Sequence, residues 1–317
     1  MYNVIVIGAV NSTAVILTKL KEHNFNVVGV LGHEPKNAEN VSGWYDLKSL
    51  ANKYDIDYYG FKRINDSEYI EWAKSKKPDI IFAVGFSQLM SSVWLQMPTL
   101  GCIGFHPTKL PEGRGRAPLA WITLEKNIGS ATFFLMGEGA DDGPIFSQSL
   151  FEVNNSDDAA SVGLKIEQHI HMALDKWLPN LKNGIWEPIP QEEALATWYG
   201  VRKPEDGCIE WSGSASYIDR LIKATTFPHP GAYTYFKDEK VIILESTKET
   251  HIPIKGVVGR ILLKDKEKGC LIQCGDGLLW INNLIFESDK IQLKVGDKLG
   301  YNIQDEIYLI KKHLKNE

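Results

Sequence analysis

The sequence predicts an α/β fold: a Rossmann-like, doubly wound and mostly parallel sheet in residues 1–190, then a small β-barrel-like (OB-like) domain with its linker in 191–317. Two observations predict this division. Short β-branched runs alternate with amphipathic helical segments from the start of the chain, which is typical of parallel sheets. Beyond residue 190, short strands separated by turns replace that alternation. A length of 317 residues also favours one large and one small domain.

The first part of the chain predicts a βαβ unit that continues with the same alternation. Short β-branched runs at residues 4–7 and 27–31 predict two strands with a helix between them. The apolar residues on one side of that helix are Val15, Ile16, Leu20 and Phe25. Helices over 44–54 and 67–76 follow, and then a strand over 79–84. Such sheets bind ligands at the carboxyl ends of their strands, so polar residues that follow strands are candidates for a site.

Two further strands are predicted to end beside loops rich in glycine and proline. One is a minimal strand over 102–104, and the other alternates apolar with polar residues over 130–136. Pro118 suits the first turn of a helix between them. A long amphipathic helix is predicted over 157–181, in which Pro179 is expected to end or kink the helix early.

The pattern changes after the proline-rich linker at 186–190. A helix is predicted over 214–225, and short strands joined by turns such as 237–240 and 275–277 follow it. Strands of this kind predict a small barrel or sandwich. The lysine-rich carboxyl-terminal end is expected to be a solvated tail or helix.

Composition excludes several classes of function. The net charge of −5 supplies no overall basic field for nucleic acid or anionic lipid. No stretch approaches the roughly 20 apolar residues of a membrane span, and the first apolar run is too short for a signal sequence. We therefore expect a cytoplasmic protein without a membrane partner. The four cysteines lack a zinc-binding spacing and are expected to be reduced, and no other spacing indicates a metal site.

Two loops hold the most specific motif of the chain. Residues 104–119 have the sequence GFHPTKLPEGRGRAPL and residues 138–144 have EGADDGP, which places His106 and Asp141 35 positions apart (141 − 106). The motif resembles that of the formyltetrahydrofolate-dependent formyltransferases, which is roughly Asn-x-His-Pro-Ser-Leu-Leu-Pro, then Arg-Gly-x-x-Pro, then Gly-x-Asp-Thr-Gly. Several irregular elements recur in the same order. The resemblance implies an N-formyltransferase that uses 10-formyltetrahydrofolate as co-substrate.

His106 and Asp141 are the predicted catalytic residues. Formyl transfer to an amine needs a base near neutral pH, and a histidine set by a carboxylate supplies one. Taken alone, His106 would be interpreted first as a hydrogen-bonded buried histidine, and it is the pair of loops that favours the catalytic interpretation. Asp142 stands at the family's threonine position and is expected to serve the turn or to support Asp141.

Gly104 departs from the family pattern, because the resembling proteins have asparagine there. Their asparagine amide helps to hold the tetrahedral oxyanion, which is worth about 2.7–4 kcal/mol for comparable donors. A backbone N–H, protonated His106 or a side chain from another loop would have to replace it. Alternatively, the glycine opens space for a bulkier acceptor, or the protein is a catalytically silent module that binds folate or a nucleotide sugar.

The resemblance also implies binding residues. Folate is expected between the loop after the strand that ends at Val84 and the loop before Asp141, and ordinary core packing is the alternative for the apolar members. These residues are Phe86, Ser87, Gln88, Leu89, Met136, Gly137, Glu138, Gly139 and Ala140. Phosphates of the acceptor are expected at the start of the first helix or beside two arginines. These residues are Asn11, Ser12, Thr13, Arg114 and Arg116, for which helix capping and solvated arginines are the alternatives.

The acceptor is expected to be a nucleotide-linked amino-deoxy sugar. Residues 202–235 resemble the start of the OB-like domain that methionyl-tRNA formyltransferases and sugar N-formyltransferases share. The former carry a longer basic loop after the second strand, whereas residues 32–40 have two acids and one lysine, which suits RNA phosphates poorly. Residues 114–121 resemble the corresponding loop of enzymes that formylate a nucleotide-linked 4-amino-4-deoxy-arabinose. The motif with glycine at position 104 is similar to that of sugar formyltransferases that act on amino-sugar intermediates of pseudaminic-acid type, and it also resembles formylation domains of peptide synthetases. Methionyl-tRNA is the alternative acceptor. The sequence leaves the oligomeric state open, and a homodimer is one possibility.

Overall fold

The computed structural model describes residues 1–36, 43–85, 88–288, 291–301 and 303–315. These residues form two compact units. The first comprises 1–122, 126–155 and 161–201, and the second comprises 123–125, 156–160 and 202–317. The first unit thus extends beyond the predicted boundary at 190, because residues 191–199 hydrogen-bond to its loops.

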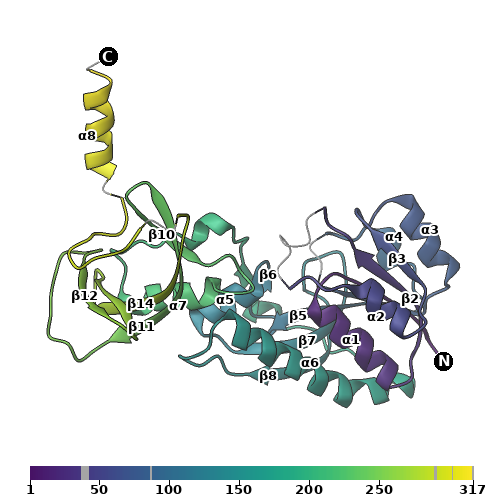
Figure 1. The fold of residues 1–317 in the computed structure, drawn as a ribbon. Helices are drawn as coiled ribbons and strands as arrows, with labels where there is room; N and C mark the ends of the chain where they lie inside the picture. Colours follow the sequence, from purple (N-terminus) through teal and green to yellow (C-terminus); the bar gives the residue numbers. More distant parts are fainter. Residues whose placement is uncertain (37–42, 86–87, 289–290, 302, 316–317) are drawn as a thin grey trace. The chain divides into compact units, whose positions relative to one another are not determined.

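A seven-stranded sheet forms the centre of the first unit, in the order β3-β2-β1-β4-β5-β7-β8 (Figure 1). Its strands are β1 (Asn3–Gly8), β2 (Asn26–His33), β3 (Tyr58–Phe61), β4 (Ile80–Val84), β5 (Gly101–Thr108), β7 (Gly129–Leu135) and β8 (Ile145–Phe151). The first five are parallel, whereas β7 runs antiparallel to both β5 and β8. The predicted mostly parallel α/β sheet is confirmed.

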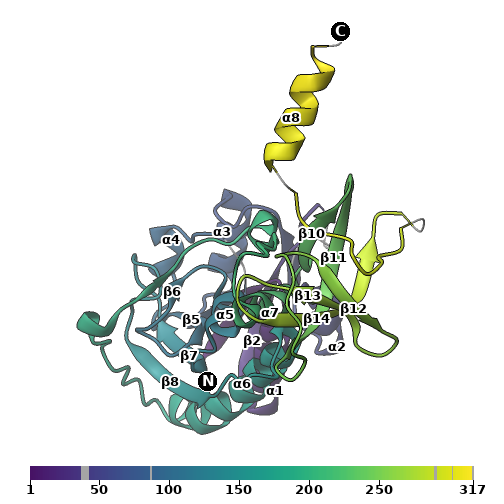
Figure 2. The same cartoon turned by 90° about the vertical axis from the view of Figure 1, so that its left-hand side faces the viewer.

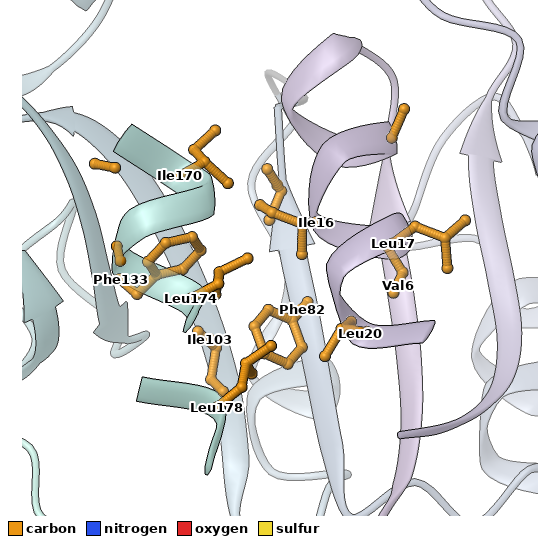
Figure 3. Close-up of a cluster of buried hydrophobic side chains, with 14 of the residues drawn as sticks. Val6, Ile16, Leu17, Leu20, Phe82, Ile103, Phe133, Ile170, Leu174 and Leu178 are labelled. Carbon is orange, nitrogen blue, oxygen red and sulfur yellow. The ribbon is translucent and has the colours of Figure 1, made fainter. Parts of the chain in front are cut away.

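Helices cover both faces of this sheet, because side chains alternate between the faces along each strand. The helices are α1 (Asn11–Glu22), α2 (Leu47–Lys53), α3 (Ser67–Ser75), α4 (Ser92–Leu95), α5 (Pro118–Glu125) and α6 (Ala159–Lys182). On one face, Phe82 and Phe133 pack in a buried cluster with Leu20 of α1 and Leu174 of α6 (Figure 3). On the other face, Trp94 of α4 lies in a second cluster with the alternate residues of the same strands, such as Ile5 and Ile81.

Some elements differ from those expected. β5 continues to Thr108, so His106 lies within the strand instead of after it. β3 and β8 were not predicted, and α2 begins at Leu47, after an Asp46 cap that accepts from two backbone N–H groups. α6 continues through Pro179 to Lys182, so the expected early end is wrong.

A five-stranded antiparallel sheet forms the core of the second unit, in the order β10-β11-β14-β13-β12, and Figure 2 shows it with α7. The elements are α7 (Ala215–Thr225), β10 (Ala232–Phe236), β11 (Glu239–Glu249), β12 (Ile261–Asp265), β13 (Gly269–Gln273), β14 (Leu278–Phe286) and α8 (Ile303–His313). Ser214 caps α7 by accepting from the N–H of Tyr217, as its position just before the helix favours. Within the described ranges, no helix is long and apolar enough to cross a membrane.

Candidate active site

His106 lies on β5 and is 5% exposed. Its Nε2 is 2.8 Å from the carbonyl oxygen of Gly113. A carbonyl oxygen only accepts hydrogen bonds, so Nε2 carries a proton and donates it. In the neutral ring, Nδ1 is therefore the nitrogen with a free electron pair, and it is the atom that can act as a base.

Asp141 faces that nitrogen. Its Oδ2 is 3.5 Å from Nδ1 of His106 and accepts a hydrogen bond of 2.9 Å from the N–H of Gly115. The distance to Nδ1 is long for a hydrogen bond, as is common at catalytic pairs without substrate. Asp141 has φ of +54°, in the left-handed region that non-glycine residues rarely adopt. The two predicted catalytic residues are thus brought together from strand β5 and from the loop between β7 and β8.

This arrangement can accept and hold a proton. The Nδ1 electron pair of neutral His106 can take up a proton, and the resulting Nδ1–H faces Oδ2 of Asp141 at a distance of 3.5 Å between the two heavy atoms. The carboxylate then stabilises the imidazolium. Asp142, by contrast, turns toward Gly139, where an added Cβ would lie 1.8 Å from its Oδ2. The geometry therefore supports Asp141 as the partner of the histidine.

Arg114 has a different place from the one expected. Its side chain is 1% exposed, and its guanidinium donates to both carboxylate oxygens of Glu193 and to Oε1 of Gln191. A guanidinium so enclosed is held by the protein and is not presented to a diphosphate. The expectation for Arg114 is therefore corrected to a structural role.

Two residues of the site were missed by the sequence analysis. Gln191 donates from Nε2 to the carbonyl oxygens of Asp141 and Gly143, at 2.8 and 2.7 Å. Thr197 accepts from the N–H of Gly113 through Oγ1 at 2.8 Å. Both lie about 50 or more positions from the loops they hold, in a segment without a motif, so no local signal marks them.

The space that a side chain at position 104 would take is filled. A Cβ on Gly104 would lie 2.6 Å from Cζ of Phe134 and 3.0 Å from Cγ of Met136. Phe134 is Gly104's neighbour across the β5–β7 pairing and is buried. The expectation that the glycine opens space for the acceptor is therefore wrong, since an aromatic ring occupies that space.

The residues expected to bind folate have different surroundings. Phe86 and Ser87 lie outside the described residues. Gln88 uses its amide within the protein, because Oε1 accepts from the N–H of Ile64 and Nε2 donates to the carbonyl oxygen of Lys62. Leu89 is 85% exposed. In the other loop, Met136 is half-buried, and the residues that follow it and are exposed are Gly137, Glu138, Gly139 and Ala140.

The start of α1 lies at the carboxyl end of β1, where the helix dipole favours an anion. The N–H of Asn11 donates to the carbonyl oxygen of Gly43 and the N–H of Thr13 to that of Val10, so these two groups are used within the protein. Thr13 is fully buried, and its Oγ1 donates to the carbonyl oxygen of Val84 and accepts from the N–H of Ala9. These bonds give Thr13 a structural role. Asn11 is exposed and Ser12 is half-buried. Among the residues that the structure describes, no group of three or more side chains is suited to a metal ion.

Comparisons with known proteins identify the family of the chain. The family model described as "Formyl transferase" matches residues 2–179, and that described as "Formyl transferase, C-terminal domain" matches 202–294. The bifunctional polymyxin resistance protein ArnA of Wigglesworthia glossinidia brevipalpis is 34% identical over 233 residues, which are 73% of this chain and 35% of ArnA. The chain thus spans about a third of that relative.

Two other proteins are similar over most of their length. A methionyl-tRNA formyltransferase of Ruminiclostridium cellulolyticum is 28% identical over 303 residues, which cover 90% of this chain and 92% of that protein. The crystal structure of an N-formyltransferase from Helicobacter canadensis has a TM-score of 0.66 at 18% identity and covers 90% of this chain and 100% of that one. The first family model alone covers more than half of the chain, and the His106–Asp141 pair lies within it. The chain therefore belongs to the formyl transferase family of enzymes.

Proposed function

We propose that this protein transfers the formyl group of 10-formyltetrahydrofolate to the amine of a nucleotide-linked amino-deoxy sugar. The observation that carries the proposal is the His106–Asp141 pair, in which Nδ1 is the basic nitrogen and faces a carboxylate. The donor follows from the family and from the folate-bound relatives: the Helicobacter canadensis structure contains folinic acid, and a similar HypX structure contains tetrahydrofolic acid.

His106 moves one proton in this reaction. The amine attacks the formyl carbon, a C–N bond forms, and the carbonyl oxygen becomes an oxyanion. Nδ1 of His106 takes a proton from the amine and returns it to the departing folate nitrogen, whose bond to the formyl carbon then breaks. Asp141 stabilises the imidazolium between these two steps. Gly104 offers no side-chain donor to the oxyanion, so a backbone N–H or a side chain from another loop must supply it.

The remaining predicted residues bind the two substrates. We assign Phe86, Ser87, Leu89, Met136 and the exposed loop 137–140 to the folate, and Asn11, Ser12 and Arg116 to the phosphates of the acceptor. Gln88 is left out, because its amide bonds to backbone groups of Ile64 and Lys62. The start of α1 supports the phosphate assignment, because the positive end of its dipole lies at the carboxyl edge of the sheet. Arg114 and Thr13 are left out, because their polar groups hold the protein itself.

An amino sugar is favoured over tRNA as the acceptor. The net charge of −5 supplies no field that would attract RNA, and the segment after β2 carries two acids and one lysine. The Helicobacter canadensis structure contains dTDP-3-aminofucose, and another similar structure is of a sugar 3N-formyltransferase. Methionyl-tRNA is the second candidate, because a methionyl-tRNA formyltransferase is similar over 92% of its length.

A direct assay tests the proposal. Purified protein is incubated with 10-formyltetrahydrofolate and nucleotide-linked 3-amino or 4-amino sugars, including an intermediate of pseudaminic-acid type, beside charged initiator methionyl-tRNA. Mass spectrometry then detects the gain of one formyl group. A formylated sugar supports the proposal, and formylated tRNA replaces it with the second candidate. No product with any acceptor would support a silent binding module, for which His106→Ala would change nothing.

A further inference from the structure

The segment 191–199 crosses both catalytic loops. Its residues Trp198 and Tyr199 form β9, which pairs in parallel with β6 (Arg114–Gly115) in the loop after His106. Near its start, Gln191 bonds to the loop that holds Asp141. The two loops are separate in the sequence, and this segment makes hydrogen bonds to both of them.

Gln191 uses every hydrogen-bonding group of its amide. Nε2 donates to the carbonyl oxygens of Asp141 and Gly143, and Oε1 accepts from Nε and Nη2 of Arg114 at 3.2 and 3.0 Å. An amide has two N–H donors and one oxygen with two electron pairs, so it is fully satisfied here. Such a side chain has one orientation, because a flip would place donors against the guanidinium.

Arg114 makes a firm anchor for Gln191. Its side chain is buried, and Glu193 binds it with two hydrogen bonds, of 3.0 and 2.9 Å. Paired bonds between a guanidinium and a carboxylate fix direction as well as distance. The N–H of Gly115, the next residue, donates to Oδ2 of Asp141. The backbone and the side chain of Asp141 are thus both held from Arg114 and Gly115.

Asp141 needs such support. Its φ of +54° is costly for a residue with a Cβ, by roughly 1–3 kcal/mol, and persists only where the surroundings hold it. Gln191 bonds to the carbonyl oxygen of Asp141 itself and to that of Gly143, two residues later, so it holds the backbone that leaves this conformation. Gly143 lies close against β7, because a Cβ there would lie 1.7 Å from the carbonyl oxygen of Leu135, so no other residue fits at this position.

We propose that Gln191 is a positioning residue, which relays the fixed orientation of the buried Arg114 to Asp141 and so holds the carboxylate opposite Nδ1 of His106. This inference rests on the proposed function for its effect on catalysis. The side-chain amide of Gln191 does not touch the reacting atoms. It acts through the backbone, because it fixes the loop that carries the Asp141 carboxylate. Catalysis is sensitive to such placement, since a displacement of about 1 Å can cost about 100-fold in rate.

Gln191→Glu tests the inference sharply. The new carboxylate still accepts from Arg114 but loses both N–H donors and faces two carbonyl oxygens. Gln191→Met, a second variant, keeps the length without charge. Glu192→Gln is the matched control, because Glu192 is the exposed neighbour in the same segment. We expect both Gln191 variants to lower kcat about tenfold or more with KM for donor and acceptor within about twofold, and the control to match the wild type.

A second readout does not depend on turnover. Hydrogen exchange at the Gly115 amide reports its bond to Asp141 directly, and we expect it to be about tenfold faster or more in both Gln191 variants and unchanged in Glu192→Gln. Unchanged exchange and unchanged kcat would overturn the inference, as would a loss of kcat that merely follows a fall in Tm. If the wild type formylates no acceptor, faster exchange still supports the positioning role, and only the proposed function fails.

Discussion

Single neighbouring atoms determine which ring nitrogen of neutral His106 carries the proton. The carbonyl oxygen of Gly113 accepts the proton of Nε2, so Nδ1 carries the free electron pair in the neutral ring and faces the Asp141 carboxylate. In the proposed reaction, Nδ1 is the base and Asp141 stabilises the charge that it acquires. The assignment of roles follows from which atoms can donate, and it gives the two carboxylates at 141 and 142 different functions.

Asp141→Asn should lower kcat by about 100- to 10,000-fold, which is the range that general base catalysis contributes, because His106 then lacks its charged partner. An amide at this position can still accept from Gly115 but carries no charge to stabilise the imidazolium. Single-turnover transfer of the formyl group measures the loss. Asp142→Asn is the control, because that exposed carboxylate does not face His106, and it should retain activity within about twofold. Equal losses in both variants would contradict the assignment.

Gly104→Asn should destabilise the protein instead of activating it. The variant restores the asparagine of the resembling family, yet its Cβ would lie 2.6 Å from the ring of Phe134. Overpacking of this kind costs typically about 1–3 kcal/mol. Denaturant unfolding measures the change, and Gly104→Asn with Phe134→Leu should recover part of it. A rise in kcat without loss of stability would show that Phe134 moves freely.

At the scale of elements, α6 was predictable because its apolar residues recur at four-residue steps over a length that few other elements reach. Those residues, Val162, Ile166, Ile170, Leu174 and Leu178, are all buried. The pairing of β5 with β7 was not predictable, because the helix α5 between them is also what a parallel connection would contain. β8 was missed because its residues lack a clear alternation of buried and exposed positions.

Leu174→Ala tests the contribution of α6. Leu174 is fully buried between this helix and the sheet, as Figure 3 shows, so truncation should leave a cavity and lower the free energy of unfolding by about 2–5 kcal/mol. Met172→Ala, on the same helix but 52% exposed, should change it by less than about 0.5 kcal/mol. Urea denaturation of both variants measures the difference. Similar losses would mean that α6 does not pack as described.

At the scale of the whole molecule, the sequence predicted two domains and the His106–Asp141 pair but not how the chain divides. The motif marks its own loops, because glycine, proline and charged residues there have particular backbone and chemical requirements. Gln191 and Glu193 lie in a segment whose composition is that of an ordinary linker, and their contacts arise only after folding. The same holds for residues 123–125 and 156–160, which belong with the second unit.

The second unit should therefore be less stable when residues 202–317 are produced alone. Arg220 of α7 is buried, and its guanidinium donates to the carbonyl oxygens of Asp157 and Thr123, both outside that fragment. Burial lowers the pKa of Arg220, and loss of acceptors for a buried charged group costs about 1–3 kcal/mol or more.

Hydrogen exchange in α7 measures this loss, and we expect it to be about tenfold faster or more in the fragment than in the intact chain, since each tenfold corresponds to about 1.4 kcal/mol. The control is Arg220→Met in the intact chain, which removes the two hydrogen bonds but keeps residues 123–125 and 156–160 in place. Exchange should then rise by less than in the fragment, because those backbone segments still cover the helix. Equal protection of α7 in the fragment and the intact chain would show that residues 202–317 form the unit without them.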